Sequence, residues 1–349
     1  MAKLRVGFVG AGGICRGAHL PAYQALKDEV EVVSAAAIAP AALDAISAAA
    51  SLSPEHLYSD YQKMLDKEKL DIVSICTPNS WHCAPTLAAF KAGCHVLGEK
   101  PIAISADQAR QMIAAGKKAK KLYMIGQTLR YFKPAAMMKQ WVDNGDVGEI
   151  YWARAQYLRV RGIPGAPGFV SKEKSQGGPI YDIGVHVLDL ALWLMGFPEP
   201  VSVSAGVYNK IASKKSPLVP FKPSEYTVPD DASFSLIRFK NGATISLECS
   251  WALNIPTAAM NVTVCGDKGG CQYDPVALLT ERKGTLERVQ PEIFQYPEPA
   301  GHHEEIRAFV EAIKKGKPSP VPGEEALVTQ RILDAIYRSG ESGKEEPVL

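Results

Sequence analysis

Asp182 and His186 are the residues whose spacing most clearly predicts chemistry, and Asp189 follows three positions further on. If this segment is helical, the three side chains share one face. An imidazole beside a carboxylate forms a proton-transfer pair, in which the carboxylate sets the orientation of the ring. The alternative is a histidine satisfied in the core of a capped helix, because apolar residues surround it. Buried polar groups need partners or a purpose, so the pattern favours proton transfer.

A second candidate is Lys100, within the sequence Glu99-Lys100-Pro101. These residues follow an apolar run, residues 94–98, that has the pattern of a buried strand. Ligands bind at the carboxyl edge of a parallel sheet, where a lysine could hydrogen-bond a substrate hydroxyl or accept its proton. From the residue type alone, a surface lysine in a turn is the commoner outcome.

A third pattern is the turn Gly10-Ala11-Gly12, which follows an apolar run at residues 4–9 and precedes a helical pattern at residues 18–26. Gly10 permits a tight turn, Gly12 lets the backbone approach a phosphate, and the helix N-terminus supplies free N–H groups. This order of strand, glycine turn and helix favours dinucleotide binding. Cys15 stands where a third glycine is usual, and an ordinary βα turn is the alternative.

Metal and serine-hydrolase chemistry find no support. The sequence His302-His303-Glu304-Glu305 lacks the second histidine of a His-Glu-x-x-His zinc site. Asp182, His186 and Asp189 could bind zinc, but spacing marks no further ligand, so we expect no metal. No Gly-x-Ser-x-Gly nucleophile elbow occurs.

The elements that must position these residues differ between the two parts of the chain. Up to residue 126, expected strands at 4–9, 30–37, 71–77, 94–98 and 122–126 alternate with expected helices at 18–26, 41–50, 82–92 and 105–119. Strands separated by helices predict a parallel, doubly wound α/β sheet. Ser105 is a good N-cap for the last of these helices.

After residue 126, long alternating segments predict a largely antiparallel sheet, with strands at 150–160, 201–208, 232–239, 243–253 and 260–265. Asn241-Gly242 predicts a hairpin between two of them. Helices are expected at 133–144, 304–314 and 324–339, an exposed loop at 211–229 and a solvated tail at 341–346. We therefore expect two domains, at 1–126 and 127–349; the family resemblance described below implies that the first binds the dinucleotide and the second binds substrate and forms the oligomer.

The composition narrows the class of protein. A chain of 349 residues suits two domains, and a net charge of +2 predicts neither a nucleic-acid nor a membrane partner. No apolar run approaches the ~20 residues of a membrane helix, and no signal-peptide pattern precedes the first strand. Seven scattered cysteines without a Cys-x-x-Cys pair argue against a disulfide framework and favour a reducing cytoplasm.

The ordered motifs together resemble the Gfo/Idh/MocA oxidoreductases over nearly the whole length. The set comprises Gly10-Ala11-Gly12, Thr77-Pro78-Asn79 with His82, the run from Ala92 to Pro101, Gly177-Gly178, Asp182, His186, Asp189, Trp193 and Gly196. The resemblance implies a Rossmann domain followed by an α/β domain with an open, predominantly antiparallel sheet. It also implies hydride transfer between a nicotinamide cofactor and a hydroxyl-bearing carbon of a sugar or cyclitol.

The same resemblance implies the residues of the site. Catalysis falls to Lys100, Asp182 and His186. The implied cofactor contacts are Gly10, Gly12, Gly13, Ile14, Ala37, Thr77, Pro78, Asn79, His82, Glu99 and Lys100. The implied substrate contacts are Lys100, Arg130, Tyr157, Arg159, Arg161, Asp182 and His186.

One departure from the family pattern concerns the cofactor. Members that prefer NAD often carry an acidic residue at the end of the second strand for the ribose hydroxyls, and Ala37 stands there. No arginine or lysine follows to hold a 2′-phosphate. We expect NAD to be favoured, with weak discrimination against NADP.

The leading hypothesis is an NAD(P)-dependent dehydrogenase or reductase of a sugar, cyclitol or glycoside. Two alternatives stay open: a redox-neutral glycoside-processing enzyme with a retained cofactor, and, less favoured, a non-catalytic dinucleotide-binding regulator. We also expect a homodimer or homotetramer, because the second sheet would expose an apolar face that includes residues 243–251.

Overall fold

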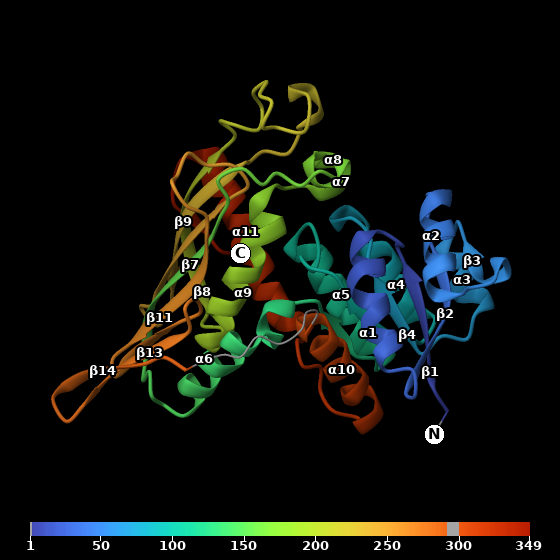
Figure 1. Ribbon diagram of the computed structural model, residues 1–349, viewed down its shortest axis with the longest axis horizontal. Helices are drawn as coiled ribbons and strands as arrows, with labels where there is room; N and C mark the ends of the chain where they lie inside the picture. Colours follow the sequence, from blue (N-terminus) through green and yellow to red (C-terminus); the bar gives the residue numbers. More distant parts are fainter. Residues whose placement is uncertain (1, 292–299) are drawn as a thin grey trace. The chain divides into compact units, whose positions relative to one another are not determined.

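The computed structural model describes residues 2–291 and 300–349. Contacts divide the chain into two compact units: unit 1 contains Met1–Thr128 and Pro297–Leu327, and unit 2 contains Leu129–Tyr296 and Val328–Leu349 (Figure 1). The sequence predicts one domain for everything after residue 126. The segment Pro297–Leu327 instead groups with unit 1, because α10 (Ala300–Lys315) packs against α1 (Leu20–Ala25). No helix in the described residues is long and apolar enough to span a membrane.

Unit 1 is built on a six-stranded parallel sheet of order β3-β2-β1-β4-β5-β6. The strands are β1 (Leu4–Val9), β2 (Val30–Ala36), β3 (Leu57–Tyr58), β4 (Ile72–Ile75), β5 (His95–Gly98) and β6 (Tyr123–Ile125). Strand β4 is buried along its whole length, as a parallel strand covered on both faces requires. The predicted doubly wound sheet is confirmed, whereas β3 is too short to give a periodic pattern.

The helices of unit 1 match the sequence patterns closely. They are η1 (Cys15–His19), α1, α2 (Pro40–Ala50), α3 (Tyr61–Lys67), α4 (Cys83–Lys91), α5 (Ala106–Ala119) and α10. The hydroxyl of Ser105 accepts the N–H of Gln108, so the predicted N-cap of α5 is present. Helix α3 is the one longer element here that the sequence analysis does not anticipate.

Unit 2 contains a nine-stranded sheet of order β14-β13-β12-β11-β7-β10-β9-β8-β15. The bounds are β7 (Ile150–Leu158), β8 (Pro200–Tyr208), β9 (Ala232–Phe239), β10 (Thr244–Ser250), β11 (Ala259–Gly266), β12 (Gly269–Gln272), β13 (Ala277–Arg282), β14 (Thr285–Val289) and β15 (Glu346–Pro347). Only β7 and β10 pair in parallel, and the other pairs are antiparallel. The predicted hairpin is confirmed: the Asn241 side chain accepts the N–H of Ala243, and Gly242 has φ +87°.

Helices cover one face of this sheet. They are α6 (Lys133–Asp143), the π-helical turn η5 (Ile180–Gly184), α9 (Val185–Leu194) and the part of α11 (Gly323–Ser342) that belongs to unit 2, with the short α7 (Pro167–Val170) and α8 (Lys172–Ser175) beside them in the chain (Figure 1). Helix α9 packs on β7 and β11, and η5 packs on β10. Residues of the strands alternate between this covered face and the outward face.

The expectation that the apolar side chains of residues 243–251 lie on an exposed sheet face is wrong. In β10, Ile245, Leu247 and Cys249 are buried on the covered face, and Trp251, just beyond the strand, is also fully buried. The outward face carries the intervening polar residues of β10, with apolar side chains supplied by neighbouring strands. The sequence pattern therefore predicts the alternating strand correctly. Its apolar side, expected to be exposed, is instead buried under the helices.

Two further expectations are confirmed in the main. The segment 211–229 has little regular structure and most of its residues are exposed, although Ala212, Val219, Tyr226 and Val228 are buried and anchor it. Residues 341–345 of the predicted tail are exposed, and the strand pairing begins only at its end, where Glu346 and Pro347 pair with Val203 and Ser202 at the edge of the sheet. In both segments a few apolar or paired residues hold a largely exposed stretch against the sheet.

Candidate cofactor and proton-transfer sites

The glycine turn of unit 1 has the geometry that a dinucleotide phosphate needs. Gly10 has φ +92°, and a Cβ there would lie 2.5 Å from the carbonyl oxygen of Cys76, so a side chain is excluded. A Cβ at Gly12 or Gly13 would meet no atom within 4 Å, so the backbone there is open to a ligand. Helix η1 follows directly. These residues fit the pyrophosphate of NAD(P).

The other cofactor candidates of unit 1 lie at the carboxyl ends of adjacent strands. Thr77 follows β4, which lies beside β1 in the sheet order, and Lys100 follows β5, which lies beside β4. Lys100 is half-buried. The strand order therefore puts the glycine turn, Thr77-Pro78-Asn79 and Lys100 at the same edge of the parallel sheet.

His82 lies buried between two loops at this edge of the sheet. Its Nδ1 lies 2.8 Å from the carbonyl oxygen of Pro101, and its Nε2 lies 3.0 Å from that of Thr77. Burial lowers the pKa of His82. The ring therefore packs between the loop after β4 and the loop that carries Lys100, and its contact with the cofactor stays a prediction.

Glu99 has a similar internal role. Its Oε1 lies 2.8 Å from Nε2 of His19, a buried residue of η1, and its Oε2 accepts the backbone N–H of Lys100. Burial raises the pKa of Glu99, but the hydrogen bond to His19 and the nearby positive charges outweigh burial and lower the pKa to about 2. This pair ties the helix after the glycine turn to Lys100. His19 was not among the predicted residues, because only the fold brings it to Glu99.

Ala37 occupies the predicted position directly after β2, where it is half-buried, and Ile38 beside it is exposed. The structure places no carboxylate at this position. Arg16, in η1, donates its Nε–H to the carbonyl of Ala11 within the glycine turn. Arg16 is thus a cationic group at the turn that the sequence analysis overlooks, because it considers only the segment after β2.

In unit 2, Asp182 and His186 lie on the less buried side of the helix formed by η5 and α9. Both are half-buried, whereas the residues between them are buried. The first turn is π-helical, so the assumption of a regular α-helix is only partly correct. The two side chains nevertheless share the side that solvent reaches, as proton transfer requires.

The glycines before η5 are required by close packing. A Cβ at Gly177 would lie 2.2 Å from the Tyr337 hydroxyl, and one at Gly178 would lie 2.3 Å from the carbonyl oxygen of Asp230. The buried carboxylate of Asp230 accepts the N–H groups of Gly178 and Ile180 and the hydroxyl of Tyr337. Asp230 therefore holds the start of the helix that carries Asp182. No local sequence pattern identifies Asp230.

Asp189 and Arg130 form a buried ion pair. The guanidinium of Arg130 donates from Nε and Nη2 to the two carboxylate oxygens of Asp189, each at 2.7 Å, and packs against the rings of Trp193 and Phe197. Both charged residues are at most 5% exposed. Asp189 is therefore buried with Arg130, whereas Asp182 and His186 are half-buried, and the contact of Arg130 with the substrate stays a prediction.

The three predicted substrate contacts at the end of β7 and just after it lie in different surroundings. Tyr157 packs with Ile183 and Trp251 on the covered face of the sheet, and the Arg159 guanidinium lies 5.2 Å from the Tyr157 ring centroid. Arg161 is held by the carbonyls of Val160 and Leu253 and by the Asn254 side chain. Tyr157 and Arg159 stay candidates for substrate binding.

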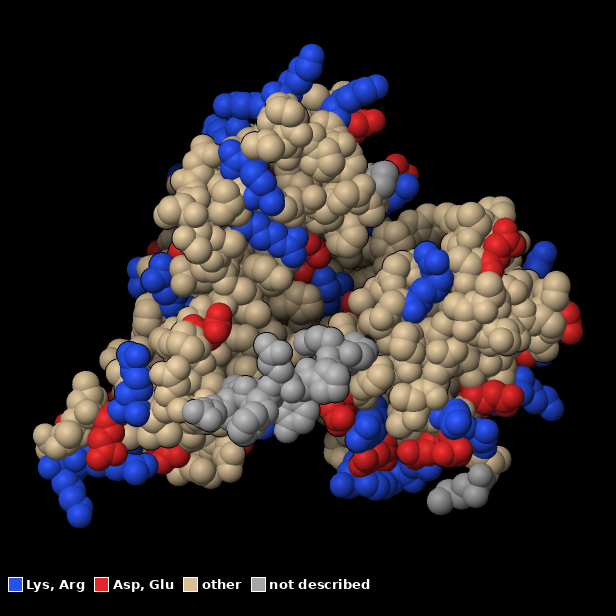
Figure 2. All heavy atoms as spheres, viewed as in Figure 1, with Lys and Arg blue, Asp and Glu red and all other residues tan. Residues whose placement is uncertain are grey.

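Arg161 lines a hollow of about 750 Å³ together with Lys210, Lys214, Lys215 and the outward-facing Glu248. Cys249, the neighbour of Glu248, contacts Gly184 on the covered face, so this hollow lies on the opposite face of the sheet from η5. Figure 2 shows lysine and arginine side chains at the top of the view, above the loops coloured yellow in Figure 1. That Arg161 contacts the substrate stays a prediction, and the hollow that it lines lies on the other face of the sheet from Asp182.

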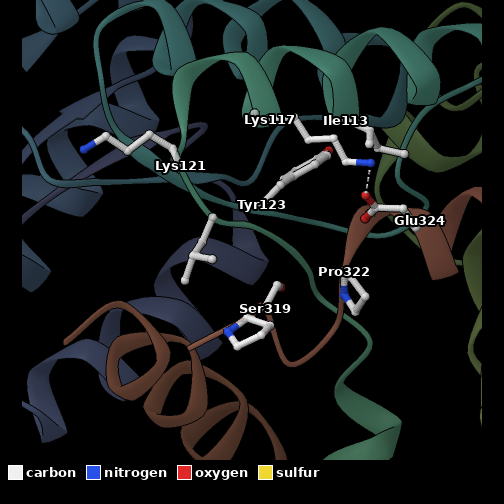
Figure 3. Close-up of a pocket in the computed structure, with 11 residues that line it drawn as sticks. Ile113, Lys117, Lys121, Tyr123, Ser319, Pro322 and Glu324 are labelled. Atoms are coloured by element: carbon white, nitrogen blue, oxygen red, sulfur yellow. Dashed lines mark ion pairs between the residues drawn. The ribbon is translucent and has the colours of Figure 1, made fainter. Parts of the chain in front are cut away.

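Figure 3 shows a second hollow, in unit 1, of about 370 Å³. It is lined by α5, the start of β6 and the segment before α11, and an ion pair between Lys117 and Glu324 spans it. The residues Lys121, Leu122 and Tyr123 place it at the amino end of β6. Ligands of such sheets bind at the carboxyl ends, so this hollow is not the cofactor site.

Asp230 gives a prediction about stability. Burial raises the pKa of Asp230 to about 6, although its hydrogen-bond donors oppose the shift. Because this pKa lies above the ordinary value, the contribution of Asp230 to folding is fully present below about pH 4 and is lost as the pH rises through 6. Asp230→Asn keeps an acceptor oxygen and cannot ionise. We expect its free energy of unfolding, relative to the wild type, to rise by about 2–3 kcal/mol between pH 4 and pH 7.

Urea unfolding at a series of pH values measures this difference. Asp44, an exposed carboxylate of α2, provides the control, because Asp44→Asn removes a charge without removing a buried one. A relative stability of Asp230→Asn that does not change between pH 4 and pH 7 would contradict the argument.

Comparisons with known proteins agree with the fold and with the motifs. The family described as oxidoreductase family, NAD-binding Rossmann fold, matches residues 4–127, and the one described as oxidoreductase family, C-terminal alpha/beta domain, matches residues 139–348. The solved structure of levoglucosan dehydrogenase in complex with NADH superimposes with a TM-score of 0.84 at 24% identity and covers 100% of both chains. At that identity the superposition supports the fold alone.

Two relatives are informative. The D-glucoside 3-dehydrogenase of Escherichia coli (strain K12) is 35% identical over 345 residues, covering 97% of this chain and 96% of the relative. The myo-inositol 2-dehydrogenase of Thermotoga maritima is 25% identical over 293 residues, covering 82% and 83% of the two chains. With both family domains matched in order across nearly its whole length, the chain belongs to the Gfo/Idh/MocA oxidoreductase family and has the NAD-binding Rossmann domain of that family.

Proposed function

We propose that the protein is an NAD(P)-dependent dehydrogenase or reductase that acts on a ring hydroxyl of a sugar, cyclitol or glycoside. The observation that carries the proposal is the 35% identity over 97% of the chain to a D-glucoside 3-dehydrogenase. A glycoside is therefore the first substrate class to test. The exposure of the residues in each unit supports it, because Lys100 in unit 1 and Asp182 and His186 in unit 2 are half-buried and so accessible to a ligand.

Each residue has a separate role in the proposed reaction. The glycine turn Gly10-Ala11-Gly12 would hold a bound NAD(P), which would supply the hydride acceptor for the carbon that bears the hydroxyl. Lys100 and His186 hold and remove the hydroxyl proton, and Asp182 orients the imidazole and favours its charged form. Tyr157 and Arg159 contact the ring hydroxyls. In the reductive direction the same groups return the proton.

The experiment is an absorbance screen at the NADH band with NAD or NADP against a panel of glycosides, free sugars and cyclitols. NADH that accumulates in proportion to the oxidised sugar supports the proposal. Product formation without net NADH release identifies the redox-neutral alternative, in which the cofactor is retained and reduced again. Tight dinucleotide binding with no product from any class would favour a regulator.

The cofactor preference follows from Ala37. A carboxylate there would accept hydrogen bonds from the NAD ribose and repel a 2′-phosphate, and Ala37 does neither. We expect the wild type to bind NAD with only modest preference over NADP, and Ala37→Asp to shift the ratio of the two Kd values toward NAD by about tenfold.

Calorimetric titration of both dinucleotides into both proteins measures the ratio. Ala39→Asp, two residues further on and exposed, is the control for added negative charge near the site. A strong wild-type preference for NADP would refute the argument and identify a cationic group outside the segment after β2, with Arg16 the first to replace.

We further propose a homodimer or homotetramer that assembles through the outward face of the unit 2 sheet. Trp152, Phe234 and Leu236 lie on that face, interspersed with the ion pair between Arg154 and Glu248. Apolar side chains on an open sheet face are unfavourable in a monomer. Light scattering at micromolar concentration should give a multiple of 37.7 kDa, and a monomer mass would overturn this proposal.

The cysteines suggest where the protein resides. All seven are free thiols, which is the usual state in a reducing compartment. We propose a cytoplasmic location, which fractionation of the producing cells would test.

A further inference from the structure

We propose that Trp251 is a positioning residue for the proton-transfer pair: its indole N–H holds the carboxylate of Asp182 in the orientation that His186 requires. The inference rests on the proposed function for its consequence in catalysis. The hydrogen bond itself is independent of the substrate, so the two can fail separately.

The contact is direct. Nε1 of Trp251 donates to Oδ2 of Asp182 at 2.9 Å, and the two residues are 69 positions apart in the chain. An indole N–H is a donor only, so it has one possible role toward a carboxylate. A donor at this distance fixes the position of one carboxylate oxygen, which defines the orientation of the other.

The indole is itself firmly held. Trp251 is fully buried directly after β10, its backbone N–H donates to the carbonyl of Asp231, and its carbonyl accepts the N–H of Gly162. The ring of Tyr226 packs edge-on against it, with centroids 6.4 Å apart. A donor that cannot rotate away acts as a fixed reference for the acid that it contacts.

Trp251 also links Asp182 to the segment 159–162, which carries the candidate substrate contact Arg159. The carbonyl of Trp251 holds Gly162, and Gly162 in turn accepts the Nη1–H of Arg159 at its own carbonyl. One residue therefore fixes Asp182 through its side chain and the Arg159 segment through its backbone. Replacing the side chain alone separates these two effects.

Nuclear magnetic resonance of the indole N–H groups tests the hydrogen bond without any substrate. The chain has five tryptophans, and Trp251→Phe identifies the signal of Trp251 by its absence. We expect this signal to move in Asp182→Asn, which replaces the charged acceptor of the indole hydrogen bond by a neutral amide. If Trp251→Phe does not fold, substitution of the other four tryptophans in turn gives the assignment by elimination.

Kinetics test the consequence. We expect Trp251→Phe to lower kcat by about 10-fold to 100-fold, the effect of one hydrogen bond to a charged group. In the Asp182→Asn background the same substitution should cause no further loss. KM should change little, because Trp251 is too deeply buried to touch the substrate.

Tyr226→Phe is the matched control. It removes a buried hydroxyl that donates to the carbonyl of Asp230 in the same cluster but leaves the indole bond in place. It should lower the melting temperature and leave kcat and the indole signal of Trp251 close to their wild-type values. An indole signal that does not respond to Asp182→Asn, or losses from Trp251→Phe and Asp182→Asn that multiply, would show that Trp251 only packs. Failure of the substrate screen would overturn the proposed function and leave the spectroscopic result standing.

Discussion

Lys100→Ala should lower kcat by about 10²–10⁴-fold on the substrate that the screen identifies, which is the usual contribution of a general acid–base group. Lys100 follows β5 at the edge where such sheets bind ligands, and it is half-buried. Its loss removes a proton-transfer group without opening a cavity in the core. We therefore expect the melting temperature to change by no more than a few degrees, roughly 0.5 kcal/mol.

Turnover and thermal unfolding measured on the same preparations check this. His186→Ala should behave likewise, and Asp182→Asn should lower kcat by leaving the imidazole wrongly oriented. Lys63, exposed on α3, is the control, because Lys63→Ala removes the same side chain far from the proposed chemistry. Near-normal turnover in all three site variants would show that the site is wrongly assigned.

Gly178→Ala should destabilise the protein by about 3 kcal/mol or more, the upper range for overpacking. The added Cβ would lie 2.3 Å from the backbone carbonyl oxygen of Asp230 and 3.0 Å from its carboxylate. A backbone atom cannot move aside as a flexible side chain can. The start of η5 must shift instead, so the N–H bond from Gly178 to Asp230 should weaken and Asp182 should be displaced, with loss of activity.

Gly168→Ala provides the matched control for this substitution. A Cβ at Gly168 would meet no atom within 4 Å, and its φ is not positive, so we expect a change within about 0.5 kcal/mol. Scanning calorimetry of both variants gives the comparison. Equal stability of Gly178→Ala and the wild type would mean that the turn is not packed as the structure shows.

The local part of each site was predictable from the sequence. The glycine turn, the strand before Lys100 and the helix that carries Asp182 and His186 depend on residues close together in the chain. Periodic apolar residues, caps and glycines act over one or two turns of helix or one strand. For that reason the doubly wound sheet, the second open sheet and the edge that carries Thr77 and Lys100 were all correctly anticipated.

The partners of the polar side chains were not predictable in the same way. Asp189 meets Arg130, Glu99 meets His19, and Asp182 meets Trp251, across separations of 59, 80 and 69 residues. Once a chain is collapsed, every buried charge must find a donor or acceptor, and the order of strands decides which one is within reach. The local sequence pattern predicts the face of the helix or strand on which a side chain lies. It does not show which side chain of a neighbouring element will lie within hydrogen-bonding distance of it. The sequence by itself thus determined which groups could perform the chemistry, and the tertiary structure decided which of them remain accessible and which are used to hold the others in place.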